Sequence, residues 1–319
     1  MGSVVRRWWG MLRALRLGAL GLGVLGMPLE ACPLGGPSAP APEEAKVCEM
    51  CPSWNEAQEP FQLFANTYYI GTKGLSVLLV VTSEGLVVLD AALPQTVPLL
   101  EANIRTLGFK LEDVRWVLTS HAHFDHVGGV AALVKRTGAQ VLSSKPGAQA
   151  LQSGRPAKAD PQRGYGAFMH FAPVKRVKGL EDGQSLSLGG VTFTLHHTPG
   201  HTPGGASWSW RSCEGDRCYN MVYVDSLNPV AAPGFRYGDP SQNPNTAAQL
   251  QKSIEKVSAL PCDVVVAAHP GFSETFEKLE RRKAGMLDAF ITPDGCKSYA
   301  SDAAQRLADR LEQEKNGAE

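Results

Sequence analysis

Short apolar runs alternate with longer amphipathic stretches over residues 54–313. The short runs are rich in Val, Ile and Leu and end at Gly, Pro or polar turn residues, a pattern typical of β-strands. We expect strands at residues 67–71, 75–82, 86–90, 114–119, 140–142, 185–188, 191–195, 206–211, 221–224 and 264–268. Helices are expected at residues 95–107, 127–137, 247–260, 275–289 and 301–313. This mixture predicts layered α/β packing with the sheets inside.

The first 53 residues follow a different pattern. Four Arg between positions 6 and 16 accompany an apolar run at 15–27, and small or helix-breaking residues follow at 28–31. This order is typical of an export signal over residues 1–31, and the run is short for a bilayer-spanning helix. A retained membrane anchor is the alternative. Residues 32–53 begin with a Pro-, Ala- and Gly-rich stretch that predicts a flexible tether, leaving one domain at 54–319.

The charge of the chain argues against a polyanionic partner. The whole chain has 31 basic and 31 acidic residues, and residues 1–31 contain four Arg and one Glu. The remaining 27 basic and 30 acidic residues give a net charge of −3. No basic stripe remains to neutralise phosphates, so nucleic acid is excluded as a partner.

The strongest chemical signal is a cluster of metal-ligand types after the strand expected at 114–119. The cluster reads His121-Ala122-His123-Phe124-Asp125-His126 and precedes two Gly. Imidazole nitrogens and carboxylate oxygens bind zinc. His121 and His123, two residues apart, share one side of an extended segment, and Asp125 and His126 turn toward a neighbouring point. The spacing therefore predicts two metal ions; the alternative is a polar loop with incidental His.

Two further His lie at positions that suit metal ligands. His201 lies in a Pro- and Gly-bounded loop between two strands, and His269 ends the strand expected at 264–268 before Pro270-Gly271. Both positions are strand ends or tight turns, where functional side chains gather. Three other His remain, and we interpret them as strand-edge residues. The alternative is that they support the metal ligands. These residues are His170, His196 and His197.

These motifs resemble the metallo-β-lactamase superfamily. The likeness rests on the residues 121–126 cluster, the Pro199-Gly200-His201-Thr202 turn and His269-Pro270, with further matches at 66–69, 102–105, 107–109, 160–162 and 211–216. Where the first subclass of β-lactamases in that family has a zinc-binding Cys, this chain has Asp225-Ser226-Leu227. That replacement resembles the third subclass, and within it the Adelaide imipenemase branch.

The resemblance implies a four-layer αββα sandwich and a di-zinc centre. His121, His123 and His201 would hold one zinc ion, and Asp125, His126 and His269 the other. The implied reaction is hydrolysis of the β-lactam amide of penicillins, cephalosporins and carbapenems by a zinc-activated hydroxide that Asp125 orients. The implied protein is a periplasmic monomer that confers antibiotic resistance.

Four other residues receive roles from the resemblance. Ser226 matches a Ser that holds the substrate carboxylate, and Asn228 stands where many relatives have a second Ser. Gln162 matches a loop residue that faces the substrate, with a plain turn residue as the alternative. Asp90, at the end of a strand, is expected to support the metal ligands.

Two other functions are compatible with the same metal motif. Lactone and thioester hydrolases of the superfamily usually bridge both metals with an Asp after the third His, and Asp225 is the candidate here. A zinc-binding protein without catalysis would need closed metal shells, whereas this ligand set leaves room for water.

The chain has seven Cys. Cys213 and Cys218 flank a short polar turn and can close a small loop, and the resemblance implies disulfides for this pair and for Cys262 with Cys296. The branch's third pair uses a Cys between residues 71 and 74, which is absent here, and the spacing of Cys48 and Cys51 allows them to pair instead. Cys32 is left over, at a position that resembles a lipoprotein cleavage site, so a lipid anchor is expected there, with a soluble periplasmic enzyme as the alternative.

Overall fold

Two β-sheets form the centre of the computed structural model, which describes residues 45–241 and 245–317. The first sheet has the strand order β1-β2-β3-β4-β5-β6-β7 and the second the order β12-β11-β10-β9-β8. The first contains β1 (Phe61–Phe64), β2 (Thr67–Tyr69), β3 (Leu78–Thr82), β4 (Gly85–Leu89), β5 (Val114–Leu118), β6 (Gln140–Ser144) and β7 (Val177–Leu180). The second contains β8 (Ser185–Leu188), β9 (Val191–His197), β10 (Ala206–Glu214), β11 (Arg217–Val224) and β12 (Val264–Ala267).

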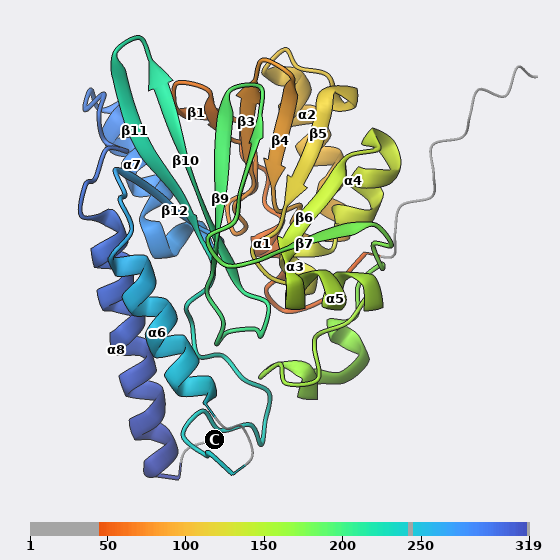
Figure 1. Cartoon of the computed structure of the whole chain (residues 1–319), viewed down its shortest axis with the longest axis vertical. Coiled ribbons are helices and arrows are strands. Elements are labelled where there is room, and N and C mark those ends of the chain that lie inside the picture. Colours follow the sequence, from red (N-terminus) through yellow and green to blue (C-terminus); the bar gives the residue numbers. More distant parts are fainter. Residues whose placement is uncertain (1–44, 242–244, 318–319) are drawn as a thin grey trace, which may run out of the picture. The chain divides into compact units, whose positions relative to one another are not determined.

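Helices cover the outer faces of both sheets (Figure 1). The α-helices are α1 (Cys51–Trp54), α2 (Val97–Thr106), α3 (Phe124–Val127), α4 (Val130–Thr137), α5 (Lys145–Ser153), α6 (Thr246–Ser258), α7 (Thr275–Lys283) and α8 (Gly295–Lys315). Four 3₁₀ turns join them: η1 (Pro94–Thr96), η2 (Leu111–Asp113), η3 (Arg163–Met169) and η4 (Pro270–Ser273). Apolar residues of α2, α4 and α5 pack on the first sheet, and those of α6 and α8 pack on the second.

Successive side chains of the central strands pack into different apolar cores, and this alternation creates the four layers. In β4, Leu86 and Val88 pack toward the helices, whereas Val87 and Leu89 pack into the core between the sheets. The strand β11 behaves likewise, with its odd- and even-numbered residues in different cores. Because successive side chains point to opposite faces, a strand that is apolar throughout must be buried on both sides. The predicted αββα sandwich is confirmed.

Several elements differ from the sequence prediction. The strands β1 and β7 and the helix α5 were not expected, and α8 begins six residues earlier than predicted, at Gly295. The segment that forms β7 contains Lys178 and Gly179, which weaken a strand signal. The helix predicted at 275–289 ends at Lys283, and Gly285 adopts a φ of 105°, which a helix cannot continue.

Three disulfides link the described residues in the predicted pairs: Cys48–Cys51, Cys213–Cys218 and Cys262–Cys296. The second joins directly opposed residues of the β10–β11 hairpin. The third ties the start of β12 to the first turn of α8. The second and third disulfides therefore join two strands of the second sheet to each other and join this sheet to its long covering helix, α8.

The predicted export signal, Cys32 and most of the predicted tether lie outside the described residues. Residues 45–53 of that tether contact the domain: Cys51 is buried in the outer core of the first sheet, and the Lys46 backbone exchanges two hydrogen bonds with the side chain of Gln95. Within residues 45–241 and 245–317, no helix has both the length and the apolar character needed to cross a membrane.

The disulfides lead to a prediction about stability. Replacing Cys262 and Cys296 together by Ser should lower the free energy of unfolding by about 3–4 kcal/mol, because the bridge closes a long loop in the unfolded chain. The matched double variant of Cys213 and Cys218 opens a much shorter loop and should cost about 2 kcal/mol. Urea unfolding measures both values, and a larger loss for the shorter loop would contradict this ranking.

Candidate metal centre

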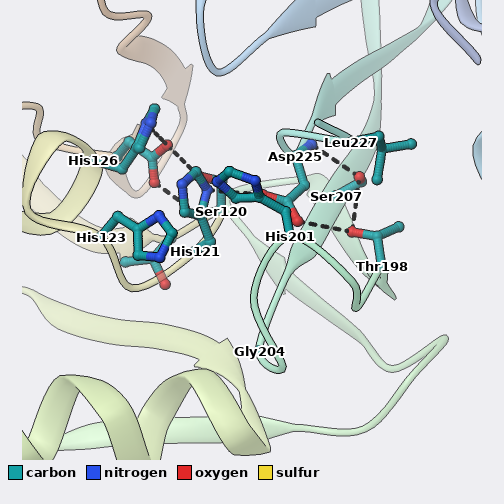
Figure 2. A network of polar contacts seen from close by, with 12 residues as sticks. Ser120, His121, His123, His126, Thr198, His201, Gly204, Ser207, Asp225 and Leu227 are labelled. Carbon is teal, nitrogen blue, oxygen red and sulfur yellow. Dashed lines mark hydrogen bonds and ion pairs between the residues drawn. The ribbon is translucent and has the colours of Figure 1, made fainter. Parts of the chain in front are cut away.

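Six potential metal ligands gather in two groups at one edge of the sandwich. The first group is His121, His123 and His201, and the second is Asp125, His126 and His269. In each group, one ligand atom from every side chain lies within 4.8 Å of the others. Figure 2 shows the rings of four of these His close together, next to the hydrogen-bonded group of Thr198, Ser207 and Asp225.

Parallel strand pairs bring these residues to the same edge. The strands β4 and β5 are parallel, with Leu89 opposite Leu118, so Asp90 and the segment that carries His121 leave the first sheet together. In the second sheet β11 and β12 are parallel, with Val224 opposite Ala267, so residues 225–228 and His269 also leave together. The carboxyl ends of parallel strands meet at one sheet edge, which is where sites of such sheets lie.

Close backbone packing positions the Asp125 and His126 segment. His123 precedes α3, and Asp125 and His126 lie within this single turn. A Cβ at Gly128 would lie 2.3 Å from the Phe124 carbonyl oxygen, and one at Gly129 would lie 2.4 Å from the Ala91 oxygen. Only Gly allows this turn to pack so closely on the loop after β4.

The second group has the spacing of a tetrahedral metal site. His126 Nε2 lies 3.2 Å from His269 Nε2 and 3.2 Å from Asp125 Oδ2, and His269 Nε2 lies 3.5 Å from the same oxygen. Ligand atoms about 2.0–2.1 Å from a tetrahedral zinc ion lie roughly 3.3 Å apart. The three atoms therefore fit three corners of such a site, and His269, with a side chain 22% exposed, lies on its solvent side.

In three of the His rings, one nitrogen contacts a hydrogen-bond acceptor outside the metal groups. The second nitrogen of each ring is left to bind a metal. His123 Nε2 lies 3.1 Å from Asp160 Oδ2, His201 Nδ1 donates to the Asn228 carbonyl at 2.7 Å, and His269 Nδ1 donates to the Gly74 carbonyl at 3.1 Å. A ring N–H held by an acceptor fixes the tautomer, so the lone pair of the opposite nitrogen faces the centre.

Buried carboxylates support the remaining two rings. His121 Nδ1 lies 2.8 Å from Asp225 Oδ1 and 3.1 Å from Ser120 Oγ, and His126 Nδ1 lies 3.6 Å from Asp90 Oδ2. Asp90 accepts hydrogen bonds from the Ser120 backbone, the Ser120 hydroxyl and the Tyr223 hydroxyl. Its φ of 61° is a strained value for a residue other than Gly, and this network holds it there. The expectation that Asp90 supports the ligands agrees with this position.

The electrostatics of the centre suit a cation. Burial lowers the pKa of His121 well below its usual value and that of His201 to about 3, so both are neutral in the form that binds metal. Burial opposes the charge on Asp125, but His126 and His269 outweigh it and lower the pKa of Asp125. Burial likewise opposes the charge on His126, yet Asp125 and Asp90 raise its pKa to about 10. A metal ion held by Asp125, His126 and His269 would replace the proton on His126.

Comparison with known proteins agrees with this architecture. The family model described as the metallo-β-lactamase superfamily matches residues 70–214. The structure of the Rm3 metallo-β-lactamase is 47% identical, with a TM-score of 0.81, and the match covers 84% of this chain and 99% of that one. MEM-A1, a subclass B3 metallo-β-lactamase from a soil metagenome library, is 42% identical with a TM-score of 0.80, and the match covers 83% and 99%.

The chain belongs to the metallo-β-lactamase superfamily. Curated relatives include hydroxyacylglutathione hydrolase of Pseudomonas aeruginosa, 30% identical over 47% of this chain and 45% of that enzyme. The chain thus spans about half the length of the curated relatives that it matches. The comparisons show close similarity to subclass B3 enzymes, while the Adelaide imipenemase branch stays a prediction.

Two of the three predicted substrate residues, Gln162 and Asn228, contact His201 of the first group. Ser226 is buried, and its hydroxyl has no hydrogen-bond partner among the described residues. The Gln162 amide nitrogen lies 3.3 Å from His201 Nε2, the nitrogen left for a metal, so the Gln162 side chain faces the centre. Asn228 contributes its backbone carbonyl to His201, a role that the sequence did not predict for it.

His196, His197 and Asp225 are not members of the two groups of potential ligands. His196 contacts Ser209 Oγ at 2.8 Å and His197 contacts the Pro203 carbonyl at 3.0 Å, so both have partners away from the metal groups. Asp225 supports His121 from outside, so it is not positioned as the metal bridge expected in a lactone or thioester hydrolase.

Sequence reasoning missed the role of Asp160. Its carboxylate lies against His123 and also accepts a hydrogen bond from the Gln162 backbone at 2.8 Å. One side chain thus orients a metal ligand and the turn that carries Gln162. Its place in an Asp-Pro-Gln turn was visible, but the partner 37 residues away was not.

Asp160 provides a test of this support. Asp160→Asn removes the carboxylate that orients His123 and should weaken zinc affinity by roughly 10- to 100-fold, measured by competition with a chromogenic chelator. Asp216→Asn, in the exposed β10–β11 turn, makes the same charge change and should leave affinity unaltered. Equal affinities for both variants would show that Asp160 does not support the metal ligand.

Proposed function

We propose that this protein is a di-zinc β-lactamase that hydrolyses the amide bond of penicillins, cephalosporins and carbapenems and so confers antibiotic resistance. The observation that carries the proposal is the arrangement after β11. Asp225 is directed to His121, and the Ser226 hydroxyl is buried without a partner among the described residues. A buried unpaired hydroxyl is costly unless a ligand or water completes its hydrogen bonds.

The donor set fits two zinc ions. Five His and one Asp offer nitrogen and carboxylate ligands, and the second group has tetrahedral spacing. Three protein ligands for each ion leave coordination positions for water and substrate. Bound zinc supplies Lewis acidity, which activates water at neutral pH and stabilises the charge that develops as the amide bond breaks.

The side chains of this protein would orient the reactants. Asp125, with two carboxylate oxygens, can bind a metal and accept a hydrogen bond from the attacking water at the same time. The Ser226 hydroxyl and the Asn228 amide are the donors that we assign to the substrate carboxylate. Gln162 lies across the centre, next to His201, and we assign it a contact with the substrate from the loop side.

A thioester or lactone hydrolase is the second candidate. The similarity to hydroxyacylglutathione hydrolases favours it. However, that similarity covers less than half of either chain, whereas the similarity to Rm3 covers 99% of the Rm3 chain at 47% identity. Asp225 contacts His121 and belongs to neither group of potential ligands, which also argues against the bridged metal site expected for this class.

The cellular location remains a proposal from residues 1–32. We infer export to the periplasm, with Cys32 as the site of a lipid anchor, because the charged, apolar and small segments precede it in the order of an export signal. Residues 45–53 lead into Trp54, at the start of the domain. The Trp54 ring lies 5.4 Å from the ring of His269, which belongs to the second group of potential ligands.

A substrate panel tests the proposed function. The purified zinc-loaded protein should hydrolyse a chromogenic cephalosporin and a carbapenem far faster than a lactone or a glutathione thioester. Removal of zinc by a chelator should abolish turnover, and readdition should restore it, with metal analysis giving two zinc ions per chain. Faster turnover of the thioester, or full activity with one zinc ion, would contradict the proposal.

The carboxylate contact is tested separately. Ser226→Ala should raise KM for several β-lactams by roughly 10-fold with a smaller change in kcat, because a hydrogen bond to a charged group is worth about 1.5–3 kcal/mol and forms before the transition state. Ser187→Ala, on the exposed strand β8, is the matched control. An unchanged KM in Ser226→Ala would remove this Ser from the substrate site.

A further inference from the structure

A cavity outside the metal centre is lined in part by residues of η4. Its volume is about 350 Å³, and it is lined by residues of β12, η4, α7 and the start of α8. Phe272 and Tyr299 form part of its wall, together with Val265 and Pro293. This wall is mostly apolar and aromatic, so it suits the hydrocarbon part of a small ligand.

Lys278 is the cation among the residues that line this cavity. The residue is only 5% exposed, and within the described ranges 45–241 and 245–317 its amine makes no hydrogen bond or ion pair, although Glu274 and Glu277 attract it electrostatically. A buried cation without a partner costs free energy, so Lys are seldom buried unless they are paired. Burial lowers the pKa of Lys278 to about 8, and the amine remains mostly protonated at pH 7.

Thr292 supplies a second unpaired group in the same cavity. Its Oγ1 atom is buried and has no hydrogen-bond partner in the described part of the chain. A Cβ at the adjacent Gly295 would lie 2.7 Å from this oxygen, so the start of α8 packs directly against it. Two polar groups that lack partners in one cavity indicate a missing ligand with hydrogen-bond acceptors.

The acidic residues of the cavity lie toward its rim and are mostly neutralised. Glu274 pairs with Arg281 at 3.0 Å, and Asp294 pairs with Lys297 at 2.9 Å. Asp302 is exposed. Among the residues that line the cavity, the buried charge is therefore the cation of Lys278, which an anion would balance. The Arg306 guanidinium adds positive charge at the same aromatic wall, 4.6 Å from the centre of the Phe272 ring. A dianion such as phosphate would meet more repulsion from the rim than a monoanion.

We propose that this cavity is a second ligand site, which binds a small monocarboxylate with an apolar or aromatic body. The carboxylate accepts hydrogen bonds from the Lys278 amine and the Thr292 hydroxyl, and the body packs on Phe272 and Tyr299. Both the chemistry and the residues of this site differ from those of the metal centre, so the assignment does not depend on the proposed β-lactamase activity.

The site lies next to two elements of the metal centre. The Phe272 ring is 6.2 Å from the ring of His269. Tyr299 donates from its hydroxyl to the Asp225 carbonyl at 2.6 Å and accepts from the Leu227 amide at 3.0 Å. A ligand against these two rings therefore contacts residues that pack on the metal ligand and hold the Ser226 loop.

Calorimetric titration of the zinc-loaded protein with benzoate tests the proposal. Benzoate should bind, whereas benzamide lacks the charge and acetate lacks the ring, so both should bind much more weakly. Lys278→Met should weaken benzoate binding by at least about 10-fold, because a charge-assisted hydrogen bond is lost. Thr292→Val, which keeps the shape but removes the hydroxyl, should weaken it by a smaller factor.

Matched control variants separate binding in this cavity from a general loss of positive charge or of folding. Lys283→Met removes an exposed Lys from the end of the same helix and should leave benzoate binding unchanged. Lys278→Met should keep or raise Tm, because it removes an unpaired buried charge, so a folding defect is not expected; should it occur, Thr292→Val carries the test. Absence of benzoate binding, equal binding of benzamide, or undiminished binding in both cavity variants would overturn the proposal, and the last result would show that benzoate binds outside this cavity.

Discussion

The central constraint on this structure is that two pairs of parallel strands end at the same edge of a sandwich whose strands are buried on both faces. The register of β4 with β5 and of β11 with β12 brings Asp90, His121, Asp225 and His269 out of the sheets next to one another. Because these strands are buried on both faces, their apolar side chains pack both on the covering helices and on the opposite sheet, and this packing holds the strand ends in place. The position of the polar centre thus follows from the packing of the apolar strands.

A concentration of His and carboxylates at a buried edge is unfavourable unless each group has a partner. The structure supplies those partners from outside the centre, through Asp160, Asp225 and two backbone carbonyls. Each of these partners also restricts the orientation of a His ring. The same contacts therefore offset the cost of burial and orient the rings for a metal ion. The opposed pKa shifts of His126 and His201 show that the edge is organised as two electrostatically different groups.

The sequence predicted the six potential metal ligands, because their residue types bind zinc and their positions follow expected strands. All six potential ligands lie at strand ends or in tight turns, which residue type and local pattern reveal. It could not predict the contacts of Asp160, Asn228 or Gly74, because two of these groups act through backbone carbonyls and each partner lies 27 or more residues away. The fold shows the same limit. Central apolar strands were predicted, whereas β7 depends on pairing with β6, and α5 depends on a Ser144 cap that only the folded backbone aligns.

The choice between the two candidate chemistries depends on one step in strand alternation. Asp225 and Ser226 follow β11 directly, and neighbouring residues of an extended segment point to opposite sides. With Val224 opposite Ala267, Asp225 turns toward His121 and the Thr198 hydroxyl, and its backbone amide is held by Ser207. Ser226 is the next residue, and its small hydroxyl cannot bridge two cations as a carboxylate would. The contact of Asp225 with His121 is therefore the feature that favours the proposed β-lactamase over a hydrolase with a carboxylate bridge.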